Sequence, residues 1–287
     1  MKSLPVQIVA KLLSMVWLRL ALVLIFSGAW TTASAEILSA DPSVGEYEVG
    51  KRLQYLEDVN SKLAVSDVIA PYWQSKFRSH RRAVANFGFT QSSYWFKLSL
   101  CNPTNLEKAW ILEARYPMLD RLDVYLVRDG KVLGHRLSGD SLPFAQREFK
   151  HRNLGFTLAL APQDQLDVYL RVKTESSLQL PLHLLTPERF LERDQSEQYL
   201  FGLYYGILLA MLLYNLLVYR ALRDVNYLHY VHYLLGYALF QLSLNGLALQ
   251  YLWPKYPVWG NLATPLFIGV AFLGAVNFAR SFLHLKS

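Results

Sequence analysis

Three long stretches without a charged side chain limit what the second half of this chain can fold into. Residues 199–219, 227–249 and 261–279 contain no Asp, Glu, Lys or Arg over 21, 23 and 19 positions. A helix rises about 1.5 Å per residue, so stretches of this length can cross a hydrocarbon core of about 30 Å. We therefore predict a membrane region over 199–287, with three transmembrane helices at 199–219, 227–249 and 261–283.

The first 35 residues have the pattern of a secretory signal peptide. Three basic and no acidic residues accompany the apolar run 20–26, and Ala33-Ser34-Ala35 supplies small residues for a cleavage site. The short apolar run favours cleavage after Ala35 over a retained anchor. We expect the next part of the chain to be exported, and with Cys101 as its one cysteine the chain can form no internal disulfide.

The distribution of charge excludes a nucleic-acid partner. The formal net charge is +7, but residues 36–198 hold 21 basic and 21 acidic side chains, so no basic surplus lies in the exported part. Arg220, Arg223 and Arg280 lie at the ends of predicted spans that face the same side, and basic residues favour the cytoplasmic side. The sequence therefore predicts a bacterial inner-membrane protein with a periplasmic N-terminal domain and a cytoplasmic C-terminus.

Residues 36–186 are predicted to form an all-β domain. Within 94–100 the apolar side chains occupy every second position, which places them on one face of a strand. Turn residues separate further runs of the same kind, and Asp129-Gly130 is the clearest hairpin turn. Strands of this length and spacing are typical of a sandwich or a barrel. The other predicted strands are 110–115, 122–127, 154–160 and 166–172.

A short helix is predicted to connect the two parts. Residues 187–198 are rich in charged, helix-favouring side chains. Thr186 is suited to cap the helix at its N-terminus, and Pro187 is suited to its first turn.

Several short motifs occur in a fixed order along the chain. In the exported part they include Ser93–Leu98, Tyr116–Asp120, Ser138–Asp140 and His151–Asn153, and in the membrane region Gly202–Gly206, Tyr214-Asn215 and Leu242–Gly246. With this order of blocks, the chain resembles the bacterial seven-transmembrane receptors with diverse intracellular signalling modules. The resemblance implies that the exported domain is the family's second type of extracellular domain, a jelly-roll-like sandwich related in shape to carbohydrate-binding modules. It also implies a receptor. Because no hydrolytic arrangement occurs in the exported part, we predict that the chain is not an enzyme.

Two functions stay open at this point. The first is a receptor-like signal-transduction protein whose sandwich senses a small, carbohydrate-like ligand and couples it to the membrane helices. The sequence ends at Ser287, without the kinase, cyclase or phosphatase module that such receptors usually carry. The alternative is therefore a truncated receptor that modulates full-length signalling partners without an output of its own. No catalytic residue, metal site or cofactor is predicted.

Candidate ligand-binding residues lie on the strand faces opposite the apolar stripes. Rings there are suited to stack on the apolar face of a sugar, while charged groups hydrogen-bond its hydroxyls. The alternative is a solvated sheet face or a second buried layer, since these strands need not share one sheet. The residues are Trp95, Arg115, Tyr125, Tyr169 and Arg171.

Arg147, His151 and Arg152 complete the candidate set from a predicted loop. They are suited to clamp an anionic or sugar ligand, because Arg recognises such groups with two parallel hydrogen bonds. The alternative is a loop held in place by hydrogen bonds from Arg to backbone carbonyls. The predicted partners are a small-molecule ligand, membrane lipid, and either a second copy of the chain or a full-length signalling partner.

Overall fold

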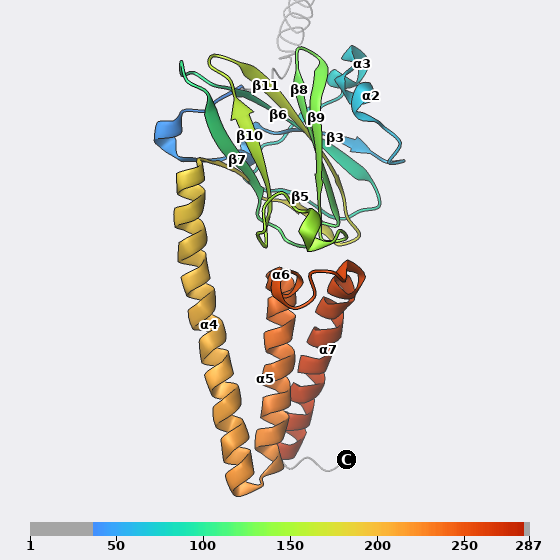
Figure 1. The fold of residues 1–287 in the computed structure, drawn as a ribbon. Helices are drawn as coiled ribbons and strands as arrows, with labels where there is room; N and C mark the ends of the chain where they lie inside the picture. The colour runs from blue at the N-terminus through green and yellow to red at the C-terminus, as the bar shows by residue number, and fades with distance from the viewer. Residues whose placement is uncertain (1–36, 284–287) are drawn as a thin grey trace, which may run out of the picture. The chain divides into compact units, whose positions relative to one another are not determined.

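Two β-sheets form the first part of the chain in a computed structural model that describes residues 37–283 (Figure 1). The predicted signal peptide lies outside the described residues. Sheet A has seven strands. Six of them pair in the order β4 (Arg78–Ser79), β3 (Gln54–Asp58), β6 (Ser93–Cys101), β11 (Gln165–Lys173), β8 (Arg121–Arg128) and β9 (Lys131–Ser138). The seventh, β1 (Leu38–Ser39), pairs parallel to β6. Sheet B has four: β10 (Leu154–Leu160), β7 (Lys108–Ala114), β13 (Leu182–Leu185) and β2 (Glu46–Glu48). A two-stranded ribbon joins β12 (Ser177–Leu180) to β5 (Ala85–Phe89).

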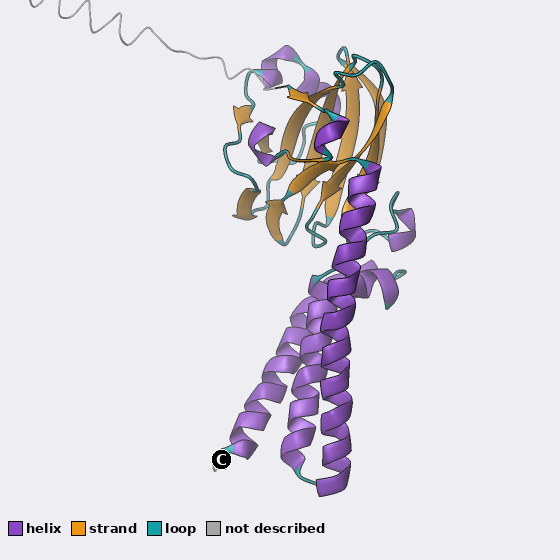
Figure 2. Cartoon of the chain, turned by 90° about the vertical axis from the view of Figure 1, so that its left-hand side faces the viewer, coloured by secondary structure: helices purple, strands orange, loops and turns teal. Residues whose placement is uncertain are grey.

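The hydrophobic core lies between sheets A and B, which form the two layers visible in Figure 2. Alternate side chains of each strand point into it, including Phe96 and Leu98 from β6 and Trp110 and Leu112 from β7, all of them fully buried. The five strands predicted from alternation are β6, β7, β8, β10 and β11, so the predicted sandwich is confirmed. The jelly-roll connectivity stays a prediction.

The predicted hairpin turn is also confirmed. Asp129 and Gly130 connect the antiparallel strands β8 and β9, with Arg128 paired to Lys131. Their φ angles of 49° and 73° are both positive, as the type I′ turn of a two-residue hairpin requires.

A second buried layer covers part of the outer face of sheet A. The short helices α2 (Val65–Ile69) and α3 (Pro71–Gln74) pack there against Trp95 and Tyr169, which are 0% and 1% exposed. The alternation of the sequence predicts that these two rings point away from the main core, but it does not indicate that helices cover them. The structure therefore agrees with the alternative of a second buried layer at these two positions.

One uninterrupted helix, α4, runs from Pro187 to Leu222 and joins the predicted connecting helix to the first predicted span. Its 36 residues extend for about 54 Å. Thr186 caps it, accepting a hydrogen bond from the backbone N–H of Arg189 at 3.3 Å, and Pro187 takes the first turn as predicted. The domain boundary predicted at residue 198 is therefore not a break in the backbone.

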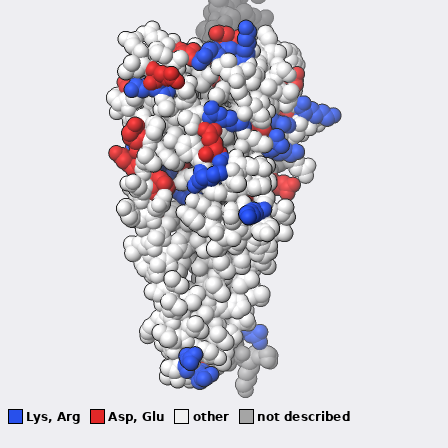
Figure 3. Space-filling view, in the orientation of Figure 1, with Lys and Arg blue, Asp and Glu red and all other residues white. Residues whose placement is uncertain are grey.

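The other membrane-region helices are α5 (Val225–Leu244), α6 (Leu247–Tyr251) and α7 (Pro257–Phe282). The predicted span 227–249 is not a single helix, because the chain breaks at Asn245-Gly246 and Gly246 has a φ of +74°. Among the described residues, α4 and α7 are long and apolar enough to cross a membrane, with mean hydropathies of 1.9 and 1.8. Tyrosines and histidines make α5 more polar, and its crossing of the membrane stays a prediction. Figure 3 shows charges of both signs over the sandwich, an uncharged surface over the middle of the helices and basic side chains at their lower end.

Helices α5 and α7 touch backbone to backbone. A Cβ atom on Gly274 would lie 2.7 Å from the backbone nitrogen of Tyr233, and one on Gly236 would lie 2.7 Å from that of Ala271. Small residues permit such close packing between helices in a membrane. Helices α5 and α7 therefore form one tightly packed pair.

Replacement of Gly274 by valine is expected to force this pair apart and to lower its free energy of unfolding by about 1–3 kcal/mol. Chemical unfolding of the full chain in detergent, followed by helical circular dichroism, measures the change. The matched control is Gly269→Val in the same helix, where a Cβ atom would have no neighbour within 4 Å. Equal losses in the two variants would contradict the packing argument.

Candidate functional site

The first turns of α4 pack on the outer face of sheet B. Phe190 enters an apolar cluster with Ile111 of β7 and Leu185 of β13, and the ring of Phe149 lies 5.6 Å from its own. Because β13 leads into α4 through Thr186 alone, the start of the helix is fixed by both the chain and this packing.

Six charged or titratable side chains, two from α4 and four from the sandwich, meet one to two helical turns beyond Phe190. We call Glu113, Arg115, His151, Arg152, Asp194 and Glu197 the junction cluster. The Glu197 carboxylate accepts hydrogen bonds from Arg115, which follows β7, and from Arg152, which precedes β10. Arg193 Nε also lies 3.6 Å from Glu197 and its guanidinium pairs with Glu46 of β2. One carboxylate on the helix thus holds guanidinium groups from two separate parts of the sandwich.

His151 links the helix to the buried carboxylate of Glu113. The backbone N–H of Asn153 donates to His151 Nδ1 at 3.2 Å, so the ring proton lies on Nε2, which is 3.0 Å from Asp194. Asn153 Nδ2 donates to Glu113 at 2.7 Å, and the same Glu113 oxygen lies 3.8 Å from His151 Nδ1. The histidine is therefore oriented by groups on both sides.

The junction cluster is largely shielded from water. The Glu113 side chain is 3% exposed, those of His151 and Arg152 are 12% and 13%, and that of Glu197 is 20%. Charges at this depth interact more strongly than surface pairs do, and removal of one partner leaves the other without compensation. Among the described residues, no group of three or more His, Cys, Asp or Glu side chains could hold a metal ion. The ion pairs that join Asp194 and Glu197 of α4 to the sandwich are suited to mechanical attachment of the helix.

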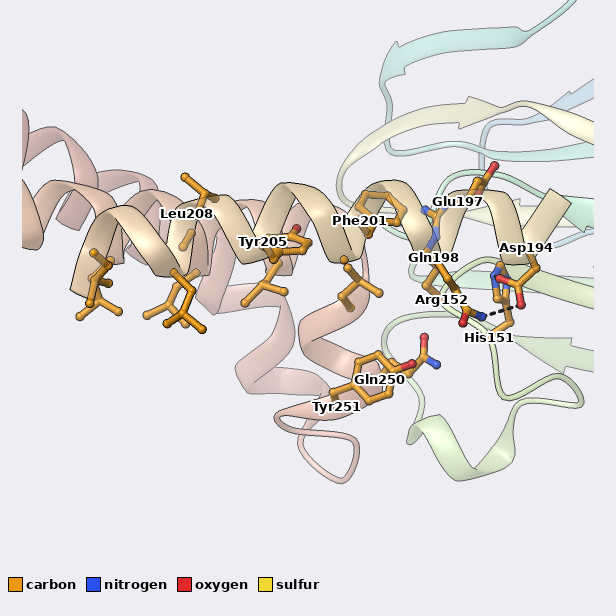
Figure 4. Close-up of a pocket in the computed structure, with 18 residues that line it drawn as sticks. His151, Arg152, Asp194, Glu197, Gln198, Phe201, Tyr205, Leu208, Gln250 and Tyr251 are labelled. Carbon is orange, nitrogen blue, oxygen red and sulfur yellow. Dashed lines mark hydrogen bonds and ion pairs between the residues drawn. The ribbon is translucent and has the colours of Figure 1, made fainter. Parts of the chain in front are cut away.

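A pocket of about 520 Å³ lies next to the junction cluster, between α4, α5 and α6. Figure 4 shows Arg152 and His151 reaching α4 near Asp194 and Glu197, while Phe201, Tyr205 and Leu208 follow along the helix. The rim of the pocket is therefore polar, and the rest of the pocket lining is mainly apolar. We call this the junction pocket.

Arg147 holds the loop that carries His151 and Arg152. Its guanidinium donates to the backbone oxygens of His151 at 3.0 Å, Arg152 at 2.8 Å and Gly139 at 3.3 Å. Burial lowers the pKa of Arg147 to about 10. This contact pattern is the one expected of the alternative, an Arg that pins its loop.

A second attachment joins the sandwich loops to the outer ends of the other helices. Asp120 accepts a hydrogen bond from Asn261 of α7 at 3.4 Å, and the backbone N–H of Phe144 donates to Pro254 at 3.0 Å. Asp140 lies beside them with its Oδ1 atom buried and without a hydrogen-bond partner among the described residues. Burial, together with the negative charge of Asp120, raises the pKa of Asp140 to about 7.

The structure brings together three of the eight predicted site residues, Arg115, His151 and Arg152. Trp95 and Tyr169 lie on sheet A and present no exposed ring face. Tyr125, on the same sheet, stacks on His135 with ring centroids 4.4 Å apart, and is half-buried. Arg171 donates to the backbone oxygen of Ser61 at 2.8 Å. The predicted aromatic platform is therefore not an open surface at Trp95 and Tyr169.

The acidic members of the site on α4, Asp194 and Glu197, were not predicted from the sequence. The signal for Glu197 was present: it is the last charged residue before the 21-residue uncharged stretch. The pairing itself depends on α4 packing against sheet B, which the sequence does not show.

Two family models match the chain, and together they cover most of it. The model described as 7TMR-DISM extracellular 2 matches residues 50–186, and the model described as 7TM diverse intracellular signalling matches residues 197–287. No curated protein matches. Among the solved structures, a GH31 alpha-xylosidase from Xanthomonas citri matches with 12% identity and a TM-score of 0.22. That match covers 47% of this chain and 16% of the xylosidase, and a similarity this low carries no argument.

Proposed function

Because the chain belongs to the 7TMR-DISM receptor family, we propose that it transmits a signal from its extracellular sandwich to the membrane through α4. The observation that carries this proposal is the attachment of one continuous helix to the sandwich. Glu197 is bonded to Arg115 and Arg152, and Asp194 is bonded to His151. A change in the sandwich that moves any of these groups therefore moves α4 as well.

The contacts on the membrane side leave α4 freer than α5 and α7. Tyr204 meets Tyr237 through their hydroxyl groups at 3.3 Å, and Asn245 donates to the Tyr205 hydroxyl at 3.0 Å. These are polar contacts at the ends of long side chains, whereas α5 and α7 meet at their backbones. We infer that α4 shifts against a rigid α5–α7 pair when the sandwich changes state.

We propose that the stimulus is a small molecule in the bacterial periplasm and that the C-terminus lies in the cytoplasm. Arg220, Arg223 and Arg280 at the ends of the helices support this orientation. A carbohydrate as the ligand stays a prediction from the sequence, and burial of Trp95 and Tyr169 weakens its support. The alternative of a modulator without its own output is not favoured, because both matching family models describe parts of a receptor.

A ligand screen on the full chain in lipid nanodiscs tests the proposal. Sugars, amino acids and organic acids are screened by the rise in Tm, and hydrogen exchange of α4 is then compared with and without each compound that binds. We expect at least one compound to change exchange both in sheet B and in residues 187–198. Compounds that bind the sandwich and leave α4 unchanged would contradict the proposed route.

A further inference from the structure

The lining of the junction pocket changes from polar to apolar along one face of α4. Asp194, Glu197 and Gln198 lie at the rim, and the lining then continues at intervals of three and four residues. The remaining α4 residues of the lining are Phe201, Gly202, Tyr205, Leu208, Leu209 and Leu212. Helix α5 contributes an opposite wall that is apolar throughout: Leu235, Ala238, Leu239 and Leu242. The pocket is therefore amphipathic along its length.

The dimensions of the pocket match one leaflet of a bilayer. From Phe201 to Leu212, the part of the α4 lining beyond the polar rim, the helix rises about 16 Å, and half of a hydrocarbon core is about 15 Å. Residues from 199 onward belong to the uncharged stretch, so the apolar part of the pocket lies at hydrocarbon depth. Arg152 lies 4.8 Å above the ring of Phe201, which places its positive charge at the boundary. A volume of about 520 Å³ is within the range of ligand pockets.

The charges around the rim select between head groups. Three arginines, Arg115, Arg152 and Arg193, face four carboxylates, those of Glu46, Glu113, Asp194 and Glu197, so the surroundings have no surplus of basic groups. A site for an anionic lipid would carry a surplus of basic groups, as polybasic lipid sites do. Here a phosphate can approach Arg152, while an ammonium group can approach the carboxylates of Asp194 and Glu197.

We propose that the junction pocket binds one outer-leaflet phospholipid whose head group carries both a phosphate and a primary ammonium. One acyl chain lies between α4 and α5, and the head group lies among Arg152, Asp194 and Glu197. The primary ammonium matters because it donates hydrogen bonds to carboxylates, which a quaternary ammonium cannot do. The lipid fills the space in which α4 and α5 do not touch. Signalling through α4 does not require this lipid, so the two proposals fail separately.

Native mass spectrometry of the full chain tests the proposal with three lipids of identical acyl chains. Phosphatidylethanolamine is expected to bind as a single copy, about tenfold more tightly than phosphatidylcholine or phosphatidylglycerol. The quaternary ammonium of phosphatidylcholine cannot donate hydrogen bonds to the carboxylates, and phosphatidylglycerol has no ammonium group to offset its negative charge beside them. The Ala238→Phe substitution fills the pocket from α5 and is expected to abolish this binding. The control, Ala210→Phe, adds the same ring at an exposed position of α4 outside the lining.

Leu212→Trp provides a second filling substitution from the opposite wall, and circular dichroism confirms that each variant is folded. Loss of the bound phosphatidylethanolamine in a folded filling variant, with retention in Ala210→Phe, supports the proposal. Equal binding of the three lipids, or binding unchanged by both filling substitutions, would overturn it. A bound second copy of the chain that Ala238→Phe removes would also overturn it, because the groove would then be a protein contact.

Discussion

Replacement of Glu197 by glutamine is expected to lower the free energy of unfolding of this protein by about 3 kcal/mol. The substitution keeps the shape of the side chain and removes the negative charge that Arg115 and Arg152 share. Arg152 then loses its carboxylate partner, and Arg115 keeps only Glu113 at 3.9 Å, while Arg193 lies close by. Removal of one partner of a buried ion pair costs about 3–5 kcal/mol, and the 20% exposure of Glu197 places it at the lower end.

The matched control lies five residues earlier on the same helix. Glu192 is 68% exposed and forms a surface pair with Arg189 at 3.2 Å, so Glu192→Gln is expected to cost less than about 0.5 kcal/mol. Urea unfolding in detergent, followed by tryptophan fluorescence, compares the two variants. If they lose the same stability, the junction cluster does not hold α4 to the sandwich.

The second large effect is on the pH dependence of stability. The pKa of Asp140 is about 7 in the folded protein, against 3.8 for an unperturbed carboxyl, because burial and Asp120 disfavour its charge. The folded state thus binds this proton more tightly than the unfolded state does. The stability contributed by the protonated form is present below about pH 4 and is lost as the pH rises to about 7. A shift of this size, which already includes the opposing effect of the positive charge of Arg147, corresponds to at most about 4 kcal/mol.

Asp140→Asn removes the ionisation and keeps the shape of the side chain. We expect the variant to be more stable than the wild type by about 3 kcal/mol at pH 8 and similar to it at pH 4. Unfolding curves at pH 4, 5, 6, 7 and 8 measure the slope in both proteins. Asp129→Asn, in the exposed hairpin turn, is the control and should leave the slope unchanged. A wild-type slope retained in Asp140→Asn would assign the pH dependence to another group.

Much of the fold could be predicted because it depends on local patterns. Alternation with a period of two located β6, β7, β8, β10 and β11, and Asp129-Gly130 located a hairpin. The break at Asn245-Gly246 was missed because it lies inside an uncharged stretch, and hydropathy does not report backbone direction. Its cause is tertiary: a Cβ on Gly246 would lie 2.7 Å from Pro117 Cβ, so the turn packs against a sandwich loop.

Helix α4 was divided in the prediction because its surroundings change at residue 198. The hydrogen bonds of a helix are internal and do not depend on the solvent around it, so the backbone continues through that change.

The site was predicted in part, for a related reason. Arg115, His151 and Arg152 stood out by residue type, but their carboxylate partners lie about 80 and 40 residues away along the chain. Trp95 was placed on the correct face of its strand, yet alternation cannot show that α2 and α3 cover that face. Long-range pairing and the covering of a surface are properties of packing, and a single strand pattern does not contain them.

The most direct measurement is the distance between the sandwich and the inner end of α4. Spin labels at Lys131 and Arg220, in a Cys101→Ser background in nanodiscs, report this distance by pulsed electron paramagnetic resonance. If the junction cluster fixes α4 to the sandwich, the wild type will give one narrow distribution, Glu192→Gln will retain it, and Glu197→Gln will broaden it. A distribution of the same width in Glu197→Gln and in the wild type would contradict the claim that α4 is coupled to the sandwich through these ion pairs.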